Sequence, residues 1–502
     1  MGSGHRQADL CKMLLRKPEA ERIRIMYLGI ILHLFSKISF VVGSYAMHFF
    51  LGRYLPEAEY GIVGTIITIM NFEYIFFTDG VRQGMAKAVS MESYEEKDLI
   101  RKGLSFQMGI VLLFFCGTYF GAPLIGRALG DAELVPYIRN IAFLLPFTGL
   151  YSLMLGILNG HKEFKAEAGT GIIYPVLKLS VIPFVLFLFT DPILGTQMGF
   201  LFAAVLISAI SSYRVWKIRP LFQRNGEKIL WAEYIKTALN YLLLFCVSTV
   251  IMNLDTLILK SVSGDNKLVG YYTGVASFSK IPYYLLTAFY TVALPLITRH
   301  YEAGEIREAG EEIGSLLDLI LVLILPAVAV ISAAAGHILA LFYKPTYRAG
   351  GNALSILIFG TSFLGMTLVF AMILSAASRK KIIGWISAGM LMMEILLCPL
   401  LTSVLSLTGT ALATFITAGA GMLISAYFTV RVYGGFWQKK HTQVLLVNLA
   451  AYVLFFVLFH YVQFTNFFVL VAVCGICYIP TAAVNIRRTG LRRPGLPSGD
   501  KK

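Results

Sequence analysis

The sequence predicts an all-helical protein that crosses a membrane about fourteen times. Hydrophobic residues occupy 57% of its 502 positions and charged residues only 14%, whereas charged residues make up about a quarter of an ordinary soluble globule. The apolar residues fall into runs of about 20, and the basic residues alternate in abundance between successive connections. Composition, run length and charge distribution all indicate that lipid surrounds most of the chain.

Each apolar run is long enough to cross the hydrocarbon core, which takes about 20 helical residues. The N-terminal run is not expected to be a cleaved signal peptide, because it is too long and no small-residue cleavage site follows it. The expected spans are 27–51, 60–81, 103–125, 137–160, 168–189, 195–213, 235–259, 268–298, 313–343, 352–376, 382–404, 407–430, 443–463 and 466–486.

The distribution of the basic residues predicts how the chain is oriented in the membrane. When the connections are assigned to alternating sides, 33 of the 43 Lys and Arg residues fall on the side that holds both termini, and seven fall on the other. Cytoplasmic loops carry such an excess, so we expect a multi-pass protein of the cytoplasmic membrane with both termini in the cytoplasm. The net charge of +15 is explained by this asymmetry and by contact with anionic membrane lipid, which argues against nucleic acid as a partner.

An internal repeat divides the chain into two lobes. The pairs Tyr60-Gly61 and Gly270-Tyr271 each open a span after a polar turn, and the two glycines lie 209 residues apart. Six spans per unit is an even number, so a parallel repeat flanking a central cavity is expected; chance similarity of apolar segments is the alternative. The predicted parts are the basic arm 1–26, the N-lobe 27–213, the linker 214–234, the C-lobe 235–430, two further helices in 443–486 and the basic tail 487–502.

Polar stripes on two spans predict a cavity for an anionic substrate. On the first span, His33, Lys37, Ser44 and His48 fall within about 60° of one another. The eighth span carries a similar stripe of Thr273, Ser277, Lys280, Tyr284, Thr287 and Thr291. Lys37 and Lys280 are expected to face each other across the cavity, although interhelical hydrogen bonds and ion pairs are the alternative. The substrate-binding candidates are Lys37, Lys280, Lys178, Arg53, His33, His48 and Tyr284.

Intramembrane acids are the candidates for ion coupling. Glu73, Asp79 and Asp255 lie in or near the spans, as does Glu394. A carboxylate there either cycles H⁺ or Na⁺ or serves as a counterion, and we expect the counterion role. The expected pairs are Asp255 with Lys260 or Lys280, and Glu73 with Lys37. Pro282, two residues beyond Lys280, predicts a helix interruption beside the charged site.

No enzymatic constellation is found in the sequence. It holds no P-loop, no HExxH and no GxSxG motif, and its acids do not pair on an aqueous loop. Cys474 and Cys477 lie in an apolar run and are interpreted as core residues. We therefore expect no enzymatic activity, no cofactor and no metal site.

Several span ends resemble one family of transporters. The segments in question are "TDGVRQGMAKAV", "LNGHKEF", "MNLDTLIL", "VGYYTGVASF", "FYKPTYRAGGNALSILIFG" and "ILSAASRKK". In this order they resemble the polysaccharide and lipid-linked oligosaccharide flippases of the multidrug/oligosaccharidyl-lipid/polysaccharide exporter superfamily. The resemblance runs from about residue 27 to 486. It implies two six-helix lobes around a cationic cavity, two extra C-terminal helices and a polyprenyl-diphosphate-linked glycan as substrate.

Two other functions remain as alternatives. The first is a cation-coupled exporter of small molecules, of the multidrug type. The second is a membrane-embedded glycan polymerase or ligase, which the short outer connections of this chain disfavour. For a flippase, the expected partners are the lipid-linked glycan, membrane lipid and H⁺ or Na⁺, and glycan polymerases or glycosyltransferases are candidate protein partners.

Overall fold

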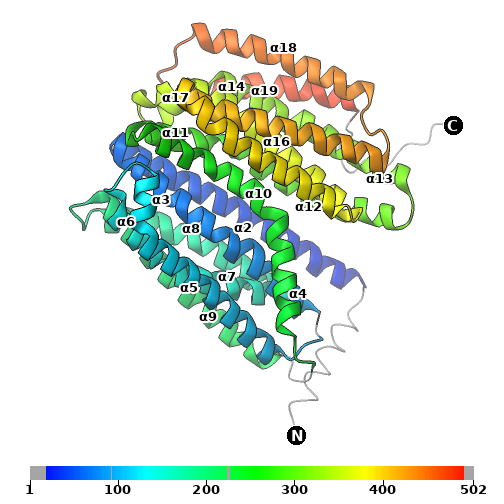
Figure 1. Cartoon of the computed structure of the whole chain (residues 1–502). Coiled ribbons are helices and arrows are strands. Elements are labelled where there is room, and N and C mark those ends of the chain that lie inside the picture. Colours follow the sequence, from blue (N-terminus) through cyan, green and yellow to red (C-terminus); the bar gives the residue numbers. More distant parts are fainter. Residues whose placement is uncertain (1–18, 92, 223–225, 491–502) are drawn as a thin grey trace, which may run out of the picture. The chain divides into compact units, whose positions relative to one another are not determined.

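The structure is a computed structural model, and it describes residues 19–91, 93–222 and 226–490. The predicted all-helical class is confirmed: the described residues form helices, and their strand pairing is limited to one isolated bridge, Tyr94 with Glu227 (Figure 1). Within these residues, nine helices are long and apolar enough to cross a membrane. Every expected span coincides with a helix or a run of consecutive helices, while the count of fourteen crossings stays a prediction.

Contacts divide the chain into two compact units. Unit 1 comprises Met1–Leu51 and Ile62–Asn253, and unit 2 comprises Gly52–Gly61 and Leu254–Lys502. The turn of the first hairpin, with the end of α2 and the start of α3, therefore belongs to unit 2, whereas the rest of these two helices belongs to unit 1.

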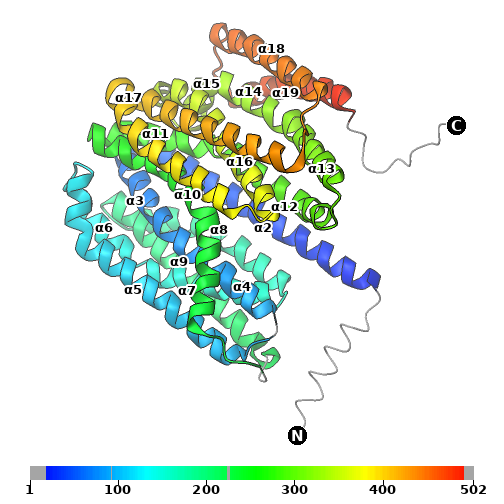
Figure 2. The same ribbon diagram turned by 45° about the vertical axis from the view of Figure 1, so that its right-hand side comes forward.

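The helices of unit 1 pack closely around α7. α7 contacts α4, α5, α8 and α9, and α5 runs alongside α6 and α7 (Figures 1 and 2). Ser152 on α7 donates its hydroxyl to the carbonyl oxygen of Phe77 at 2.9 Å, which gives a π-helical turn an extra partner. The elements are α2 (Glu19–Tyr54), α3 (Glu57–Ile75), η1 (Phe76–Arg82), α4 (Gln83–Ser90), α5 (Glu96–Ala128), α6 (Leu134–Ala142), α7 (Leu145–Gly160), α8 (Phe164–Leu186), α9 (Pro192–Ile218), η2 (Arg219–Leu221) and the first part of α10 (Trp231–Ser263).

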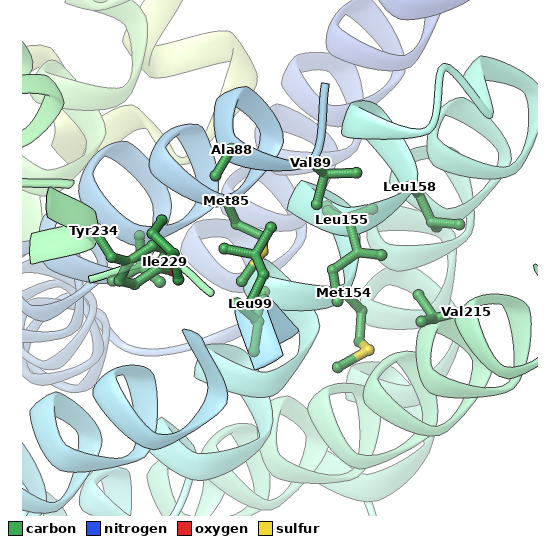
Figure 3. Packing of buried hydrophobic residues seen from close by; sticks show 13 residues of the cluster. Met85, Ala88, Val89, Leu99, Met154, Leu155, Leu158, Val215, Ile229 and Tyr234 are labelled. Carbon is green, nitrogen blue, oxygen red and sulfur yellow. The ribbon is translucent and has the colours of Figure 1, made fainter. Parts of the chain in front are cut away.

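A hydrophobic cluster joins these helices at the predicted cytoplasmic end of unit 1 (Figure 3). Tyr234 of α10 is fully buried in it, edge-on to Phe106 with ring centroids 5.9 Å apart. Burial of each such side chain stabilises the unit by about 1.5–3 kcal/mol. The other labelled members are Met85, Ala88, Val89, Leu99, Met154, Leu155, Leu158, Val215 and Ile229.

The segment before α10 is attached to the loop between α4 and α5. The backbone N–H of Glu95 donates to the carbonyl of Glu227 at 3.0 Å, and Lys102 Nζ donates to the carbonyl of Ile229 at 2.6 Å. Tyr94 donates its hydroxyl to Glu233 at 2.5 Å. That bond, with the adjacent negative charges, raises the pKa of Tyr94 to about 12.

Unit 2 contains the remaining helices. α18 and α19 pack side by side and contact α14 (Figure 1). α17 is a hairpin of two spans, because its helix is broken at Ser406, where φ is 51°; this break lies between the predicted spans 382–404 and 407–430. The elements are α11 (Asn266–Ser279), α12 (Ile281–Glu302), α13 (Ile306–Leu319), η3 (Ile320–Ile324), α14 (Leu325–Ala333), α15 (Ala335–Phe342), η4 (Pro345–Gly350), α16 (Gly351–Ala376), α17 (Lys380–Tyr433), α18 (Lys439–Tyr461) and α19 (Phe467–Thr489).

Candidate functional site

Lys280 lies at a break between two helices of unit 2. It separates α11 from α12, and Pro282 occupies the first turn of α12. The interruption expected next to Pro282 is present in the structure. Lys280 is the N-cap of α12, so it lies at the positive end of the α12 dipole. The lysine charge and the helix dipole therefore both favour binding of an anion at this helix start.

Asp255 is the carboxylate next to this lysine. It lies on α10, is buried, and is close enough to Lys280 for the two charges to interact. Its Oδ2 accepts a hydrogen bond from the Tyr272 hydroxyl at 2.8 Å, and its Oδ1 accepts one from the backbone N–H of Thr256 at 2.6 Å. The carboxylate is therefore held by neutral donors as well as by the lysine charge.

Lys260, the other basic residue considered for Asp255, is bonded elsewhere. Its Nζ donates to the side-chain oxygen of Asn266 at 2.6 Å and lies 3.4 Å from the carbonyl of Gly264. These bonds connect the end of α10 to the start of α11. Lys260 thus contributes to the turn between two helices.

A second buried carboxylate lies near Asp255. Glu394, in the first arm of α17, is fully buried and accepts a hydrogen bond from Thr414 in the second arm at 2.8 Å. Glu394 and Asp255 are close enough to interact electrostatically. The sequence places Glu394 in mid-span, but it does not indicate the grouping with Asp255 and Thr414, because α10 and the two arms of α17 contribute these side chains.

Lys178 is a basic residue of unit 1 within a predicted span. It lies on α8, and its Nζ is 4.4 Å from the ring centroid of Tyr174 and 5.3 Å from that of Phe200 on α9. Within the part of the chain that the structure describes, this ammonium group makes no ion pair. Aromatic faces attract a cation without neutralising its charge, so Lys178 keeps its charge available to an anion.

Glu73 of unit 1 is also buried. Thr118 on α5 donates its hydroxyl to one carboxylate oxygen of Glu73. This arrangement resembles that of Glu394 and Thr414.

The remaining candidates are distributed differently. Arg53 is exposed, belongs to unit 2, and donates to the carbonyl oxygen of Leu341 at 3.1 Å. Tyr284 is exposed one turn after Lys280 on α12, and His48 is partly buried on α2. The side chains of His33, Lys37 and Asp79 lie outside the described residues, so the expected pairs that involve them stay predictions.

Within residues 19–91, 93–222 and 226–490, no three His, Cys, Asp or Glu side chains lie close enough together to hold a metal ion.

Known proteins resemble this chain in sequence and in fold. The family model described as polysaccharide biosynthesis protein matches residues 27–300, and the MatE model matches 241–400. An uncharacterised membrane protein of Methanocaldococcus jannaschii is 23% identical, covering 79% of this chain and 95% of its own length. Lipid II flippase MurJ of Bacillus subtilis is 22% identical, covering 75% and 77%.

Two solved structures share the fold. One is a lipid II flippase MurJ in an inward closed conformation, with a TM-score of 0.73, 16% identity, and coverage of 92% of this chain and 99% of that one. The other is an inward-facing multidrug resistance MATE family transporter of the MOP superfamily, with a TM-score of 0.64, 15% identity, and coverage of 80% and 98%. At these identities the likeness concerns the fold, which is that of transporters.

Proposed function

This chain belongs to the polysaccharide biosynthesis protein family, within the multidrug/oligosaccharidyl-lipid/polysaccharide exporter superfamily, and on that premise we propose that it flips a polyprenyl-diphosphate-linked oligosaccharide. The substrate crosses the cytoplasmic membrane by alternating access of the two units. Both termini face the cytoplasm in this proposal, as the distribution of basic residues predicts.

The observation that carries the proposal is the setting of Lys280. An ammonium group inside a span is costly unless it serves a substrate path or has a partner. Asp255 is close enough to Lys280 for the two charges to interact, while its oxygens accept hydrogen bonds from Tyr272 and Thr256. A diphosphate that reaches this position gains the lysine charge and the α12 dipole together.

Lys178 supports the same substrate class from unit 1. Its ammonium group makes cation–π contacts with the rings of Tyr174 and Phe200. These contacts leave the ammonium N–H groups able to donate to a phosphate. Among the described side chains, each unit thus contributes a cation from within a predicted span, Lys178 from unit 1 and Lys280 from unit 2. An exporter of cationic drugs would instead be expected to present acids to its substrate.

The test is flipping of a labelled undecaprenyl-diphosphate oligosaccharide in proteoliposomes that contain the purified protein. Lys280→Ala and Lys178→Ala should abolish flipping, and Lys→Arg at either position should retain part of it, because the charge survives. Lys97→Ala is the matched control, since Lys97 is exposed in the first turn of α5, outside the predicted spans. Normal flipping by both alanine variants would refute the proposal.

A specific observation favours a second candidate, cation-coupled export of small molecules. Asp255, Glu394 and Thr414 place two carboxylates and a hydroxyl in one buried region of unit 2, and such oxygen donors suit H⁺ or Na⁺. Efflux of a small compound from vesicles without any lipid carrier, driven by an imposed proton or sodium gradient, would favour this function. Flipping that requires the lipid carrier would favour the first.

A further inference from the structure

The helix break at Lys280 packs against α16. α16 contacts both α11 and α12 within unit 2 (Figures 1 and 2). Thr361 is buried in α16, and its hydroxyl donates to the carbonyl oxygen of Ser279, the last residue of α11. The end of a helix leaves its last carbonyl groups without intrahelical partners, and inside a span such groups are costly because water is absent. Thr361 therefore supplies a donor at the point where α11 ends.

A glycine lets α12 approach the same helix. Gly365 lies one turn after Thr361 on α16, and a Cβ atom there would be 2.6 Å from Cδ1 of Leu286 and 3.3 Å from Cα of Tyr283. Both of these residues belong to the first two turns of α12. A small residue at a helix crossing lets the two backbones come close together. α16 thus contacts the end of α11 through a hydrogen bond and the start of α12 through close packing.

The Thr361 hydroxyl is used differently from two other hydroxyl groups of α16. Those of Ser362 and Thr367 donate to carbonyl oxygens four residues earlier in their own helix, at 2.6 and 2.9 Å. Such bonds are common for serine and threonine within a helix. The Thr361 hydroxyl also lies 3.1 Å from the carbonyl oxygen of Ile358 in α16, but its contact with Ser279 is the shorter one. This hydroxyl therefore links α16 to the helix break.

We propose that Thr361 is a positioning residue of the anion site at Lys280. By fixing where α11 ends, it fixes the direction in which α12 begins. That direction determines where the Lys280 ammonium group and the positive end of the α12 dipole meet a diphosphate. The proposal rests on the proposed function, and Thr361 acts in it through Lys280 and α12, without contact with the substrate.

Asp255 and Thr361 have separate tasks at this site. The carboxylate of Asp255 interacts with the charge of Lys280, whereas Thr361 bonds the backbone of the residue before it. A charge interaction acts over several ångströms and depends little on direction, whereas a hydrogen bond is short and directional. A binding group has to be held in place by its neighbours if it is to meet its ligand with the right geometry. Compensation of the lysine charge alone does not define the start of α12, so the bond from Thr361 is needed as well.

The first experiment measures binding of inorganic diphosphate to the purified full-length protein by isothermal titration calorimetry. Thr361→Val keeps the side-chain shape and removes the hydroxyl, so it should weaken binding roughly two- to tenfold, the range that one hydrogen bond contributes. Thr361→Ser keeps the hydroxyl and should retain most of the affinity. The matched control is Thr367→Val, which removes a buried hydroxyl whose bond stays within α16, and it should bind like the wild type.

The second experiment follows the helix break without any ligand. Amide hydrogen exchange of residues 276–286 should be faster in Thr361→Val than in the wild type, because the break loses its attachment to α16. Exchange in α18 and α19 should be unchanged. Thr361→Ser and Thr367→Val should exchange like the wild type in all of these segments.

A variant on the other side of the break guards against loss of fold in Thr361→Val. In Gly365→Ala, the added methyl group must displace Leu286 and the backbone at Tyr283. This variant should therefore weaken diphosphate binding and speed the exchange of residues 276–286, in both cases to a smaller extent than Thr361→Val.

The outcomes separate this proposal from the proposed function. A wild type that binds no diphosphate would refute the anion site itself. If the wild type binds diphosphate, and the folded variants among Thr361→Val and Gly365→Ala bind it equally well, only the positioning role is overturned. Faster exchange without weaker binding would also overturn it, because the bond would then hold the helices without serving the anion. An equal loss of affinity in Thr367→Val would do the same.

Discussion

The two mid-span lysines that the structure describes have the same charge and different surroundings. Lys280 has the buried carboxylate of Asp255 nearby, and that carboxylate is itself held by Tyr272 and Thr256. Lys178 rests on two aromatic rings. The difference teaches that a charge inside a span can be stabilised either by a counterion or by aromatic faces. Only a counterion is itself charged, so replacing one member of such a pair leaves the other charge buried without its partner.

The largest expected effect is that of removing the counterion. Asp255→Asn leaves Lys280 without its neighbouring negative charge, and breaking a buried pair in this way costs about 3–5 kcal/mol. The amount of monodisperse protein in detergent should fall sharply. Size-exclusion chromatography of a fluorescent fusion would measure it.

A double variant sharpens this test. Asp255→Asn with Lys280→Met removes both charges and should restore abundance while flipping stays lost, because the anion-binding charge is gone. If Asp255→Asn alone keeps normal abundance and makes residual transport insensitive to the proton or sodium gradient, Asp255 is a coupling acid and the counterion interpretation is wrong.

The next effect concerns Lys178, which we expect to matter for transport far more than for stability. Lys178→Ala loses ring contacts worth about 0.5–2 kcal/mol, but it also removes the cost of keeping an ammonium group away from water. The melting temperature should therefore change little while flipping of the diphosphate substrate is lost. Thermal unfolding of purified protein and the flipping assay together check this. A melting temperature as low as that of Asp255→Asn would indicate a hidden counterion.

The helical organisation was accessible from sequence because hydropathy is a signal along the chain. The apolar runs located the helices, and the boundary between the predicted spans 382–404 and 407–430 coincides with the break of α17 at Ser406. Pro282 indicated the interruption at Lys280 because proline removes a backbone donor. Each of these features is decided by residues that are neighbours in sequence.

The partners of the buried groups were less accessible, because they are contributed by distant helices. Nothing in the run around Glu394 indicates that Thr414 faces it or that Asp255 is near. The bond from the Arg53 guanidinium to the carbonyl of Leu341 could not be predicted either, and the place of Arg53 in the cavity stays a prediction. A stripe on one helix defines a face, but it does not define which element covers that face.

A smaller effect is expected from the glutamates that share a threonine partner. Gln has the same shape as Glu and still accepts a hydrogen bond, so Glu73→Gln should keep the bond from Thr118 and change the free energy of unfolding by less than about 1 kcal/mol. Glu394→Gln should have a similarly small effect on unfolding, but it alone should alter any dependence of transport on Na⁺ or pH, because Glu394 lies near Asp255. Equal loss of ion dependence in both variants would contradict this assignment. Transport under imposed gradients is the measurement.

The smallest effect on the free energy of unfolding is expected for a carboxylate that accepts its hydrogen bond on the protein surface. Tyr94 and Glu233 are bonded at 2.5 Å on an exposed surface, so Tyr94→Phe should lower the free energy of unfolding by well under about 1 kcal/mol, in contrast with the loss expected for buried Asp255. The bond raises the pKa of Tyr94 from 10.0 to about 12. Its stabilisation is therefore fully present below pH 10 and is lost as the pH rises through 12. Denaturant unfolding of the wild type and Tyr94→Phe should consequently differ by the same small amount at pH 7 and pH 9. A gap that widens or closes between these two pH values would mean that another group, and not the Tyr94 hydroxyl, controls the attachment of the linker.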